Sequence, residues 1–506
     1  MSRKPALGAH AVFDPTAWIG TVDRRLFGSF VEHMGRGVYT GIYEPDHPTG
    51  DEDGLRRDVI ELVREMGVTA VRYPGGNFVS GYRWEDGVGP ADERPVRLDL
   101  AWHTRETNAF GLDEFMRWTA AVGVEPMLTV NLATRGVLEA VDLLEYANHP
   151  GGTELSDMRI AHGAAEPYGI RTWCLGNELD GPWQVGHKTA TEYGRTACET
   201  ARAMRRFDPS LRLVLAGSSA AWMPTFGDWE RTVLREAYEQ VDDISLHAYY
   251  EEGDDLASFL ASGVAMDRYI EEVVAIVDEV ADAKGTEKRV ELSMDEWNVW
   301  YITRHEATFP PADWAEAPRI AEDAYTVADA VVVGSLLISF LKHADRVTSA
   351  CLSELVNTIA PIKTEPGGEA WRESTFHPFA LTARHARGRA VGLTIAGPSL
   401  ETAAHGDVAA LDGVAVVNDD SGAIALFVVN RHPTAAVELS LDLGSVPAVR
   451  VESALVLSDE DVHAVNTLAQ PQRVRPAPLP DTRVDDASLR TRLPAVSWAM
   501  IRLERA

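Results

Sequence analysis

Two glutamates in this chain stand directly after short apolar runs and beside amide and aromatic side chains. Glu178 follows residues 173–175, a break at Gly176 and Asn177, and Glu296 lies within the segment 290–301. A pair of carboxylates can divide the work on a glycosidic bond, because one donates a proton to the leaving oxygen and the other acts at the anomeric carbon. Flat tryptophan faces suit sugar rings. The two segments therefore predict a glycosidase cleft with Glu178 and Glu296 as its catalytic acids.

Further polar residues follow other apolar runs. Asn177 can hold a sugar hydroxyl, Arg72 can pair with a carboxylate, and His247 and Tyr249 can orient the two glutamates. Each residue alone also fits a structural role, such as an ion pair for Arg72 or a satisfied core histidine for His247. Convergence of so many polar groups at one face favours a site. The set comprises Glu32, Arg72, Asn77, Asn131, Asn177, His247, Tyr249, Asn298 and Glu354.

Apolar runs typical of buried strands alternate with segments of helical periodicity from residue 26 to residue 352. This alternation predicts an α/β fold, a (β/α)8 TIM barrel, in which catalytic groups stand at the C-terminal strand ends. The expected strands are 26–33, 69–72, 125–131, 170–176, 212–216, 243–247, 290–294 and 347–352, and the expected helices are 55–66, 112–121, 136–148, 189–207, 229–240, 266–283 and 321–343.

The pattern changes after about residue 385, where short alternating strands replace long helices. These strands predict a C-terminal β-sandwich, jelly-roll-like in form. A short extended segment, residues 9–13, ends at Asp14-Pro15 and is expected to pair with the sandwich. The predicted domains are the catalytic barrel, 18–385, and the sandwich, 1–17 together with 386–506.

Composition limits the partners. The chain has 506 residues, 45% of them hydrophobic, and a formal net charge of −30, which argues against nucleic acid and anionic membranes as partners. Three cysteines are too few and too scattered for a disulfide framework or a zinc site, and Cys174 and Cys351 lie in apolar runs that favour buried thiols. Residues 1–20 contain no apolar signal segment, and residues 330–341 are too short to span a bilayer. We therefore expect a cytoplasmic protein.

The strand-end motifs resemble those of glycoside hydrolase family 51, whose typical member is an intracellular α-L-arabinofuranosidase. The resemblance runs from about residue 9 to the C-terminus, and matches at most strand ends at once make it specific. The matching segments are 30–33, 41–45, 72–78, 173–178, 246–250, 295–301 and 351–362.

The resemblance implies a retaining double displacement with Glu178 as general acid/base and Glu296 as nucleophile. It also implies an arabinose subsite formed by Glu32, Arg72, Asn77, Asn177 and Tyr249, no cofactor, and a homo-oligomer, often a hexamer. Its implied substrates are arabinose-containing oligosaccharides such as those of arabinoxylan and arabinan. The chain departs from the family at Glu354, where members usually carry Gln. We expect Glu354 to pair with a cation, to contact a sugar hydroxyl or to stay protonated.

Other functions remain open at this point. Another retaining barrel glycosidase, such as a β-xylosidase or an endoglucanase, is the nearest alternative. A metal-dependent sugar isomerase on the same fold would need metal ligands, and the sequence shows no HExxH motif or tight His/Asp/Glu cluster. A sugar-binding protein without catalysis would have no need to retain both acids.

Overall fold

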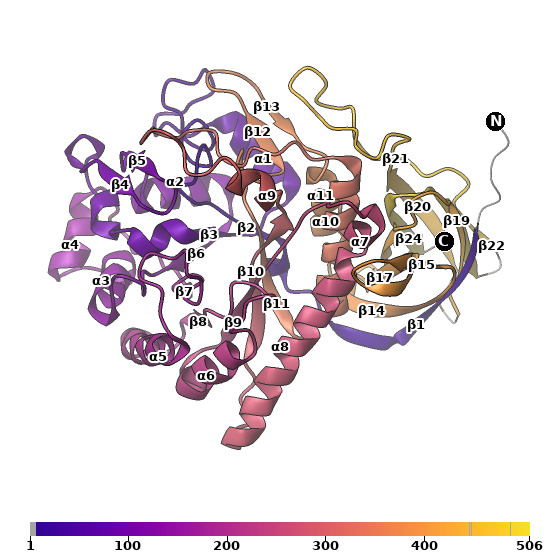
Figure 1. Cartoon of the computed structure of the whole chain (residues 1–506), viewed down its shortest axis with the longest axis horizontal. Coiled ribbons are helices and arrows are strands. Elements are labelled where there is room, and N and C mark those ends of the chain that lie inside the picture. Colours follow the sequence, from indigo (N-terminus) through magenta and orange to yellow (C-terminus); the bar gives the residue numbers. More distant parts are fainter. Residues whose placement is uncertain (1–6, 445, 447, 486, 506) are drawn as a thin grey trace.

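The computed structural model describes residues 7–444, 446, 448–485 and 487–505. The chain forms two parts, a closed barrel that takes up most of the molecule and a sheet domain at one side (Figure 1). The expectation that residues 1–6 join the sheet domain falls outside the described residues. No described helix is long and apolar enough to cross a membrane.

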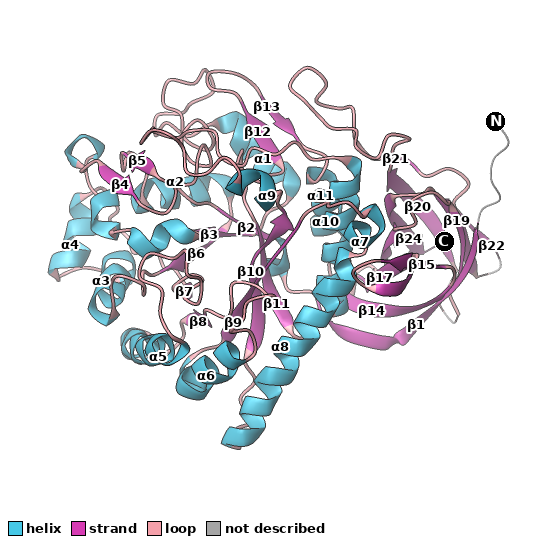
Figure 2. Cartoon of the chain, in the orientation of Figure 1, coloured by secondary structure: helices cyan, strands magenta, loops and turns pink. Residues whose placement is uncertain are grey.

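Eight parallel strands close the barrel, in the order β10-β11-β2-β3-β6-β7-β8-β9. The (β/α)8 prediction is confirmed. Figure 2 shows the helices packed outside these strands. The barrel strands are β2 (Gly28–Phe30), β3 (Ala70–Tyr73), β6 (Glu125–Thr129), β7 (Thr172–Leu175), β8 (Arg212–Leu215), β9 (Asp243–Tyr250), β10 (Glu291–Val299) and β11 (Val347–Leu352).

The helices around the barrel begin and end at recognisable capping residues. Thr189 and Thr326 cap the N-termini of α5 and α10, and Gly67 ends α1 in the left-handed region with φ 79°. The cap at Thr326 explains why α10 starts later than the predicted residue 321. The helices are α1 (Arg57–Met66), α2 (Leu112–Val122), α3 (Val137–Asn148), α4 (Glu154–Ala161), α5 (Ala190–Phe207), α6 (Asp228–Ala237), α7 (Leu256–Leu260), α8 (Ser262–Lys284), α9 (Ile302–Glu306), α10 (Val327–Lys342) and α11 (Phe376–His385).

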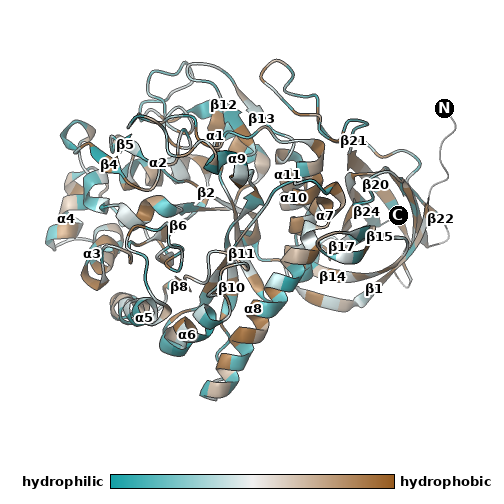
Figure 3. Ribbon diagram, viewed as in Figure 1, coloured by the Kyte–Doolittle hydropathy of each residue, from teal (hydrophilic) through white to brown (hydrophobic). Residues whose placement is uncertain are grey.

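Helix α11 is absent from the sequence-based prediction. It is separated from β11 by a long segment that contains the hairpin of β12 (Ile362–Thr364) and β13 (Ala370–Arg372), so the strand–helix alternation is interrupted. Helix α8 shows the amphipathic pattern that the sequence predicts, and its ribbon alternates between brown and teal in Figure 3. Along α8, the side chains of Ile270, Val273, Ile276 and Val280 are buried, and that of Val274 is half-buried.

The sheet domain is one ladder of ten strands, in the order β21-β20-β24-β18-β17-β14-β1-β19-β23-β22. Apolar side chains from strands along this ladder enclose a second core. The strands are β1 (Leu7–Thr21), β14 (Arg389–Ala396), β17 (Leu411–Val417), β18 (Ile424–Asn430), β19 (Val437–Asp442), β20 (Val449–Leu457), β21 (Ala477–Pro478), β22 (Arg483–Asp485), β23 (Ser488–Leu493) and β24 (Ser497–Arg505). Two further hairpins pair β4 (Arg97–Asp99) with β5 (Thr104–Glu106) and β15 (Ser399–Thr402) with β16 (Gly406–Ala409).

Strand β1 is longer than the sequence indicates. It runs past Pro15, and its antiparallel pairing with β14 shifts register between Phe13 and Trp18. Proline is tolerated at such an irregularity because no ladder N–H is required there. In Figure 1, indigo β1 lies beside orange β14, so the first described strand belongs to the same sheet as the strands after residue 388.

Helix α10 packs between barrel and sheet domain. Nearly all its side chains are buried, and it contacts β17, β18 and β24. A Cβ at Gly334 would lie 2.2 Å from the Trp498 ring, so only glycine lets this ring lie against the helix. The barrel and the sheet domain therefore share a packed apolar interface.

Candidate active site

Glu178 and Glu296 reach the same end of the barrel through local breaks in strand geometry. Glu178 follows β7 after Gly176 (φ 93°) and itself has φ 47°, a left-handed conformation that is costly for a non-glycine residue. The pairing of β10 with β9 shifts register between Ser293 and Glu296. Such irregularities redirect side chains and concentrate near active sites.

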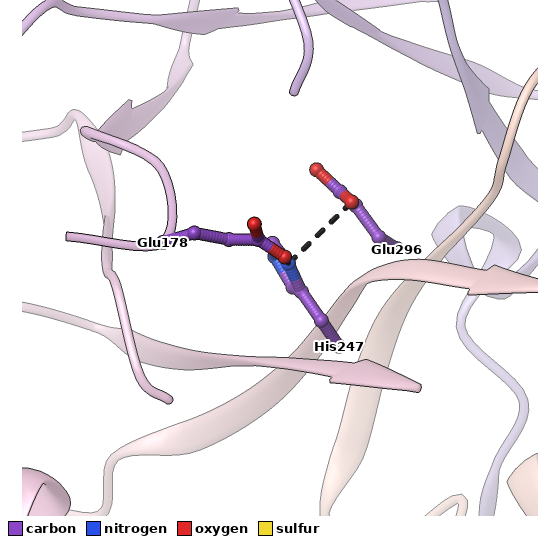
Figure 4. Close-up of side chains that lie close together, drawn as sticks. All are labelled: Glu178, His247 and Glu296. Carbon is purple, nitrogen blue, oxygen red and sulfur yellow. Dashed lines mark hydrogen bonds and ion pairs between the residues drawn. The ribbon is translucent and has the colours of Figure 1, made fainter. Parts of the chain in front are cut away.

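The two carboxylates meet at His247. Its Nδ1 lies 2.9 Å from Glu178 Oε1 and 3.5 Å from Glu296 Oε2, and Figure 4 shows the imidazole against Glu178 with Glu296 opposite. One ligand atom from each of the three side chains lies within 4.8 Å of the others. Carboxyl groups of retaining glycosidases are about 5–5.5 Å apart, whereas those of inverting enzymes are about 6.5–9.5 Å apart. The geometry therefore fits a retaining pair.

Both oxygens of Glu296 are held by donors. Arg72 Nη1 donates to Oε1 at 3.0 Å and the Tyr249 hydroxyl donates to Oε2 at 2.8 Å. Burial raises the pKa of Glu296, and the charge of Glu178 adds to this effect, while His247, Arg72 and Tyr249 oppose it. Burial alone would lower the pKa of His247, but the charge of Glu296 and the hydrogen bond with Glu178 raise it overall. The site thus orients Glu296 and supplies positive charge beside it.

Arg72 also fixes the amide of Asn177. Its Nη2 donates to Asn177 Oδ1 at 2.6 Å, so the Nδ2 group of Asn177 points elsewhere. This Nδ2 is buried and has no hydrogen-bond partner among the described residues. A buried donor without a partner is costly. Asn177, like Arg72 and His247, is not among the residues that line the pocket, so the structure leaves this donor unsatisfied beside the pocket wall.

The acids face a small pocket, and both of them line it. Glu32 is fixed in it, because Oε1 accepts hydrogen bonds from the Phe78 N–H at 2.7 Å and from Trp102 Nε1 at 2.6 Å. A side chain at Gly76 (φ 60°) would overlap the Glu32 carboxylate. The lining residues are Phe30, Glu32, Met34, Gly76, Asn77, Trp102, Glu178, Tyr249, Glu296, Trp300, Glu354 and Ile359.

Glu354 lines this pocket without a cation. Its side chain forms no ion pair with any residue that the structure describes, so the first of the three expectations for it is wrong. Oε2 accepts a hydrogen bond from the Glu32 N–H at 3.1 Å, and buried Oε1 has no partner in the described chain. Burial raises the pKa of Glu354 well above its usual range, and the neighbouring charge of Glu32 raises it further. The other two expectations for Glu354, that it stays protonated or that it contacts a sugar hydroxyl, remain predictions.

Glu178, His247 and Glu296 also form a possible metal-ligand cluster. The sequence shows no such cluster at metal-binding spacing, because its three members come from separate strands and meet only in space. Arg72 lies 3.0 Å from Glu296, and its positive charge disfavours a cation there. The donors fit acid–base work by the carboxylates better than a metal centre.

Two residues singled out by the sequence serve the scaffold instead. Asn131 caps a loop, since its side chain bonds Tyr82, Ala133 and Thr134. Asn298 Nδ2 donates to the Ile359 carbonyl at 2.6 Å and also bonds the Ser353 carbonyl, which fixes the segment that carries Glu354. Neither residue lines the pocket.

Three further residues contact the site. Trp183 Nε1 donates to Glu178 Oε2 at 2.9 Å, and Gln184 bonds Asn77 Oδ1 and lies 3.5 Å from the same glutamate oxygen. Their position in the Gly181-Pro182 turn after Glu178 was an available signal. Trp102 had none, because it lies in the turn between the short strands β4 and β5, which the strand–helix alternation does not predict.

Comparisons with known proteins agree with this geometry. Residues 62–269 match the model described as α-L-arabinofuranosidase 1 domain, and residues 295–497 match the α-L-arabinofuranosidase C-terminal domain. The chain is 56% identical to an intracellular exo-α-(1→5)-L-arabinofuranosidase of Streptomyces lividans, over 98% of this chain and 75% of that one. It is 51% identical to an exo-α-(1→6)-L-arabinofuranosidase of Bifidobacterium longum, over 97% of both.

A solved structure is similar throughout. It is that of a family 51 α-L-arabinofuranosidase from Bifidobacterium longum, with a TM-score of 0.95 and 46% identity, and the match covers 99% of this chain and 100% of that one. The likeness therefore includes the barrel, the sheet domain and the strand ends that carry the acids.

Proposed function

Because the chain belongs to the α-L-arabinofuranosidases of glycoside hydrolase family 51, we propose that it is a retaining, exo-acting enzyme that releases terminal non-reducing α-L-arabinofuranosyl residues. One observation carries this function. Two buried carboxylates approach within 4.8 Å at the base of a pocket and share His247 between them. Such a pair supports double displacement.

In the first step, Glu296 attacks the anomeric carbon while Glu178 donates its proton to the leaving oxygen. The glycosidic bond breaks and a glycosyl ester forms on Glu296. In the second step, Glu178 takes a proton from water, the water oxygen attacks the same carbon, and the ester bond to Glu296 breaks. Two inversions give net retention.

The surrounding residues have supporting roles in this proposal. Arg72 and Tyr249 hold Glu296 in its attacking orientation through the bonds at 3.0 and 2.8 Å. His247 lies between the acids and balances their charge. The free Nδ2 of Asn177 is a donor for a sugar hydroxyl beside the reaction centre. Glu32, Asn77 and Glu354 line the pocket and contact the remaining hydroxyls.

Exo action is supported by two relatives, which are named as exo-acting α-L-arabinofuranosidases. Relatives act on α-(1→5) linkages in one case and α-(1→6) linkages in another. We propose arabinose-containing oligosaccharides, of the kinds found in arabinan and arabinoxylan, as substrates. The nearest alternative is another retaining barrel glycosidase, such as a β-xylosidase.

Hydrolysis of p-nitrophenyl α-L-arabinofuranoside tests the function, with proton NMR of the first-formed sugar as the readout of configuration. We expect retention and a strong preference over p-nitrophenyl β-xyloside and β-glucoside. A larger kcat/KM for the xyloside would favour the alternative, and initial inversion would exclude double displacement.

We also propose where the protein is located in the cell, how it assembles and where its two domains begin and end. A cytoplasmic protein is supported by the name of the Streptomyces lividans relative, which is called intracellular. A homo-oligomer, a hexamer by resemblance, is to be tested by light scattering. We retain a barrel domain and a sandwich domain with limits near 18 and 385. Because β1 stays paired with β14 as far as Thr21, the N-terminal limit fits better just after that residue.

A further inference from the structure

Two exposed tryptophans stand beside the proposed acid/base. Trp183 is 44% exposed and Trp222 is 71% exposed. Their ring centroids are 6.2 Å apart with 42° between the planes. Large exposed apolar groups that lie together often mark ligand or partner surfaces. The pair therefore needs an explanation beyond core packing.

The loops that carry the two rings are tied to the active site and to each other. Trp183 Nε1 donates to Glu178 Oε2 at 2.9 Å. A Cβ at Gly181 would lie 2.5 Å from the Trp183 ring, so the ring lies directly on this glycine. Asp180 Oδ1 accepts a hydrogen bond from the Ser219 N–H at 3.1 Å, which joins the loop after β7 to the loop after β8. Trp222 is held in the second of these loops.

The two tryptophans lie on the Glu178 side of the site, and this position indicates which part of a substrate they would contact. Glu178 protonates the leaving oxygen, so the sugar bonded to that oxygen extends from the Glu178 side of the pocket. Trp183 donates a hydrogen bond to Glu178, and Trp222 lies beside Trp183 and is the more exposed of the two rings. A saccharide chain that leaves the pocket therefore meets first one ring and then the other, whereas a sugar in the pocket meets neither Trp183 nor Trp222, since neither lines it.

We propose that Trp222 forms a stacking surface for the leaving group, an inference that rests on the proposed function. The sugar it would contact is the second residue of the leaving group, counted from the scissile bond. The ligand class is an unbranched arabino-oligosaccharide of three or more residues. Trp faces bind apolar sugar faces at low entropic cost, and binding energy from such remote residues can raise kcat/KM.

The test is W222A, measured on α-(1→5)-linked arabinobiose and arabinotriose. Only the triose has a second leaving-group residue. We expect the ratio of kcat/KM for triose to that for biose to fall about three- to tenfold, and W222F to retain most of the wild-type ratio. W18A is the matched control, because Trp18 is 55% exposed but lies on β1 in the sheet domain; its ratio should equal that of the wild type.

Two results would overturn the inference. One is a W222A ratio equal to that of the wild type. The other is a changed oligomeric state of W222A by sedimentation with an unchanged ratio, which would assign the ring to contact with a second copy of the chain. Failure of the wild type to cleave either sugar or p-nitrophenyl α-L-arabinofuranoside would instead reject the proposed function itself.

Discussion

The two ends of the barrel bury acids in different surroundings. At the N-terminal end, Asp243 on β9 pairs with Arg212 on β8 and accepts a hydrogen bond from Thr348 Oγ1 at 3.1 Å. At the C-terminal end, Glu354 is equally buried but has no described cation, and Asn177 Nδ2 has no described partner. One oxygen of Asp243 also lacks a hydrogen bond. The two acids therefore differ in whether a cation lies beside them, and they do not differ in having an oxygen without a partner.

This contrast separates stability from function. Unpaired buried acids are costly, and proteins retain such groups where a substrate will use them. In barrels the N-terminal face serves stability and the C-terminal face carries catalysis. Substitutions at the two ends should therefore have opposite consequences, and the predictions below test that difference from the largest effect to the smallest.

The largest effect is expected for the nucleophile. E296A should lower kcat/KM for p-nitrophenyl α-L-arabinofuranoside by at least about 10⁴-fold, without loss of folding.

E178A should lower kcat/KM by roughly 10²–10⁴-fold for substrates with poor leaving groups. Azide should restore turnover of this variant and give a glycosyl azide of retained configuration. Rescue of E178A with inverted configuration would reverse the two roles.

At the N-terminal end of the barrel, a substitution should reduce stability and leave activity nearly unchanged. R212A leaves Asp243 buried without its cation, so we expect it to lower the free energy of unfolding by about 3–5 kcal/mol while kcat/KM stays within about twofold. Urea denaturation monitored by tryptophan fluorescence measures the first quantity. R195A is the matched control, because the exposed Arg195–Glu199 pair should contribute less than about 1 kcal/mol. If R212A were inactive but as stable as the parent, the N-terminal end of the barrel would not serve stability as we infer.

Arg72 belongs to the functional end although it forms ion pairs. R72M should reduce kcat/KM on the order of 10²-fold, because Glu296 and Asn177 lose their shared partner. Arg72 lowers the pKa of Glu296 against the dominant effect of burial, which raises it. Since Glu296 must be ionised to attack, removing Arg72 should move the acidic limb of the kcat/KM profile to higher pH. R72K, which keeps the charge, should move this limb less, and an equal shift in both variants would exclude the electrostatic role.

The sequence predicted the strand-end acids well, because apolar runs followed by polar residues mark the mouth of a barrel. It did not predict which polar groups serve the scaffold. Asn131 and Asn298 resemble ligand-binding amides in sequence, yet their bonds to nearby backbone are visible only in space. Trp102 reaches Glu32 from the turn of the β4–β5 hairpin, and no periodicity indicates such a contact.

The sheet domain was the least predictable part. Asp14-Pro15 looked like the end of a strand, but β1 continues beyond it because a register shift removes the need for a proline N–H. Strand β20 alternates between half-buried and exposed side chains only over residues 449–453, and residues 454–457 are all half-buried or buried, so only part of it shows a strand-like pattern. Local pattern does not record either effect.

The smallest and sharpest effect is expected at Glu354. Burial raises its pKa well above the usual range, followed by the charge of Glu32, so the group stays protonated above the ordinary glutamate pKa of about 4.3. A protonated carboxyl can donate a hydrogen bond as the amide of Gln does. E354Q should therefore keep kcat within about threefold at neutral pH. It should also remove any rise in KM caused by ionisation of Glu354 in alkaline solution. Where the parent carries this charge, E354Q should change the selectivity between arabinofuranosides and other pentosides.

Stability gives an independent measure of the same protonation. An acid whose pKa is raised by folding binds its proton more tightly in the native state, so stability falls as pH rises from about 4.3 towards the raised value. Glutamine has no such loss. E354Q should consequently raise the melting temperature more at pH 7 than at pH 4, whereas E354A should lower it at both because it leaves a cavity. If E354Q matches the parent in its pH–rate profile, its substrate ratios and its melting temperature at both pH values, Glu354 replaces glutamine neutrally and its missing cation has no functional meaning.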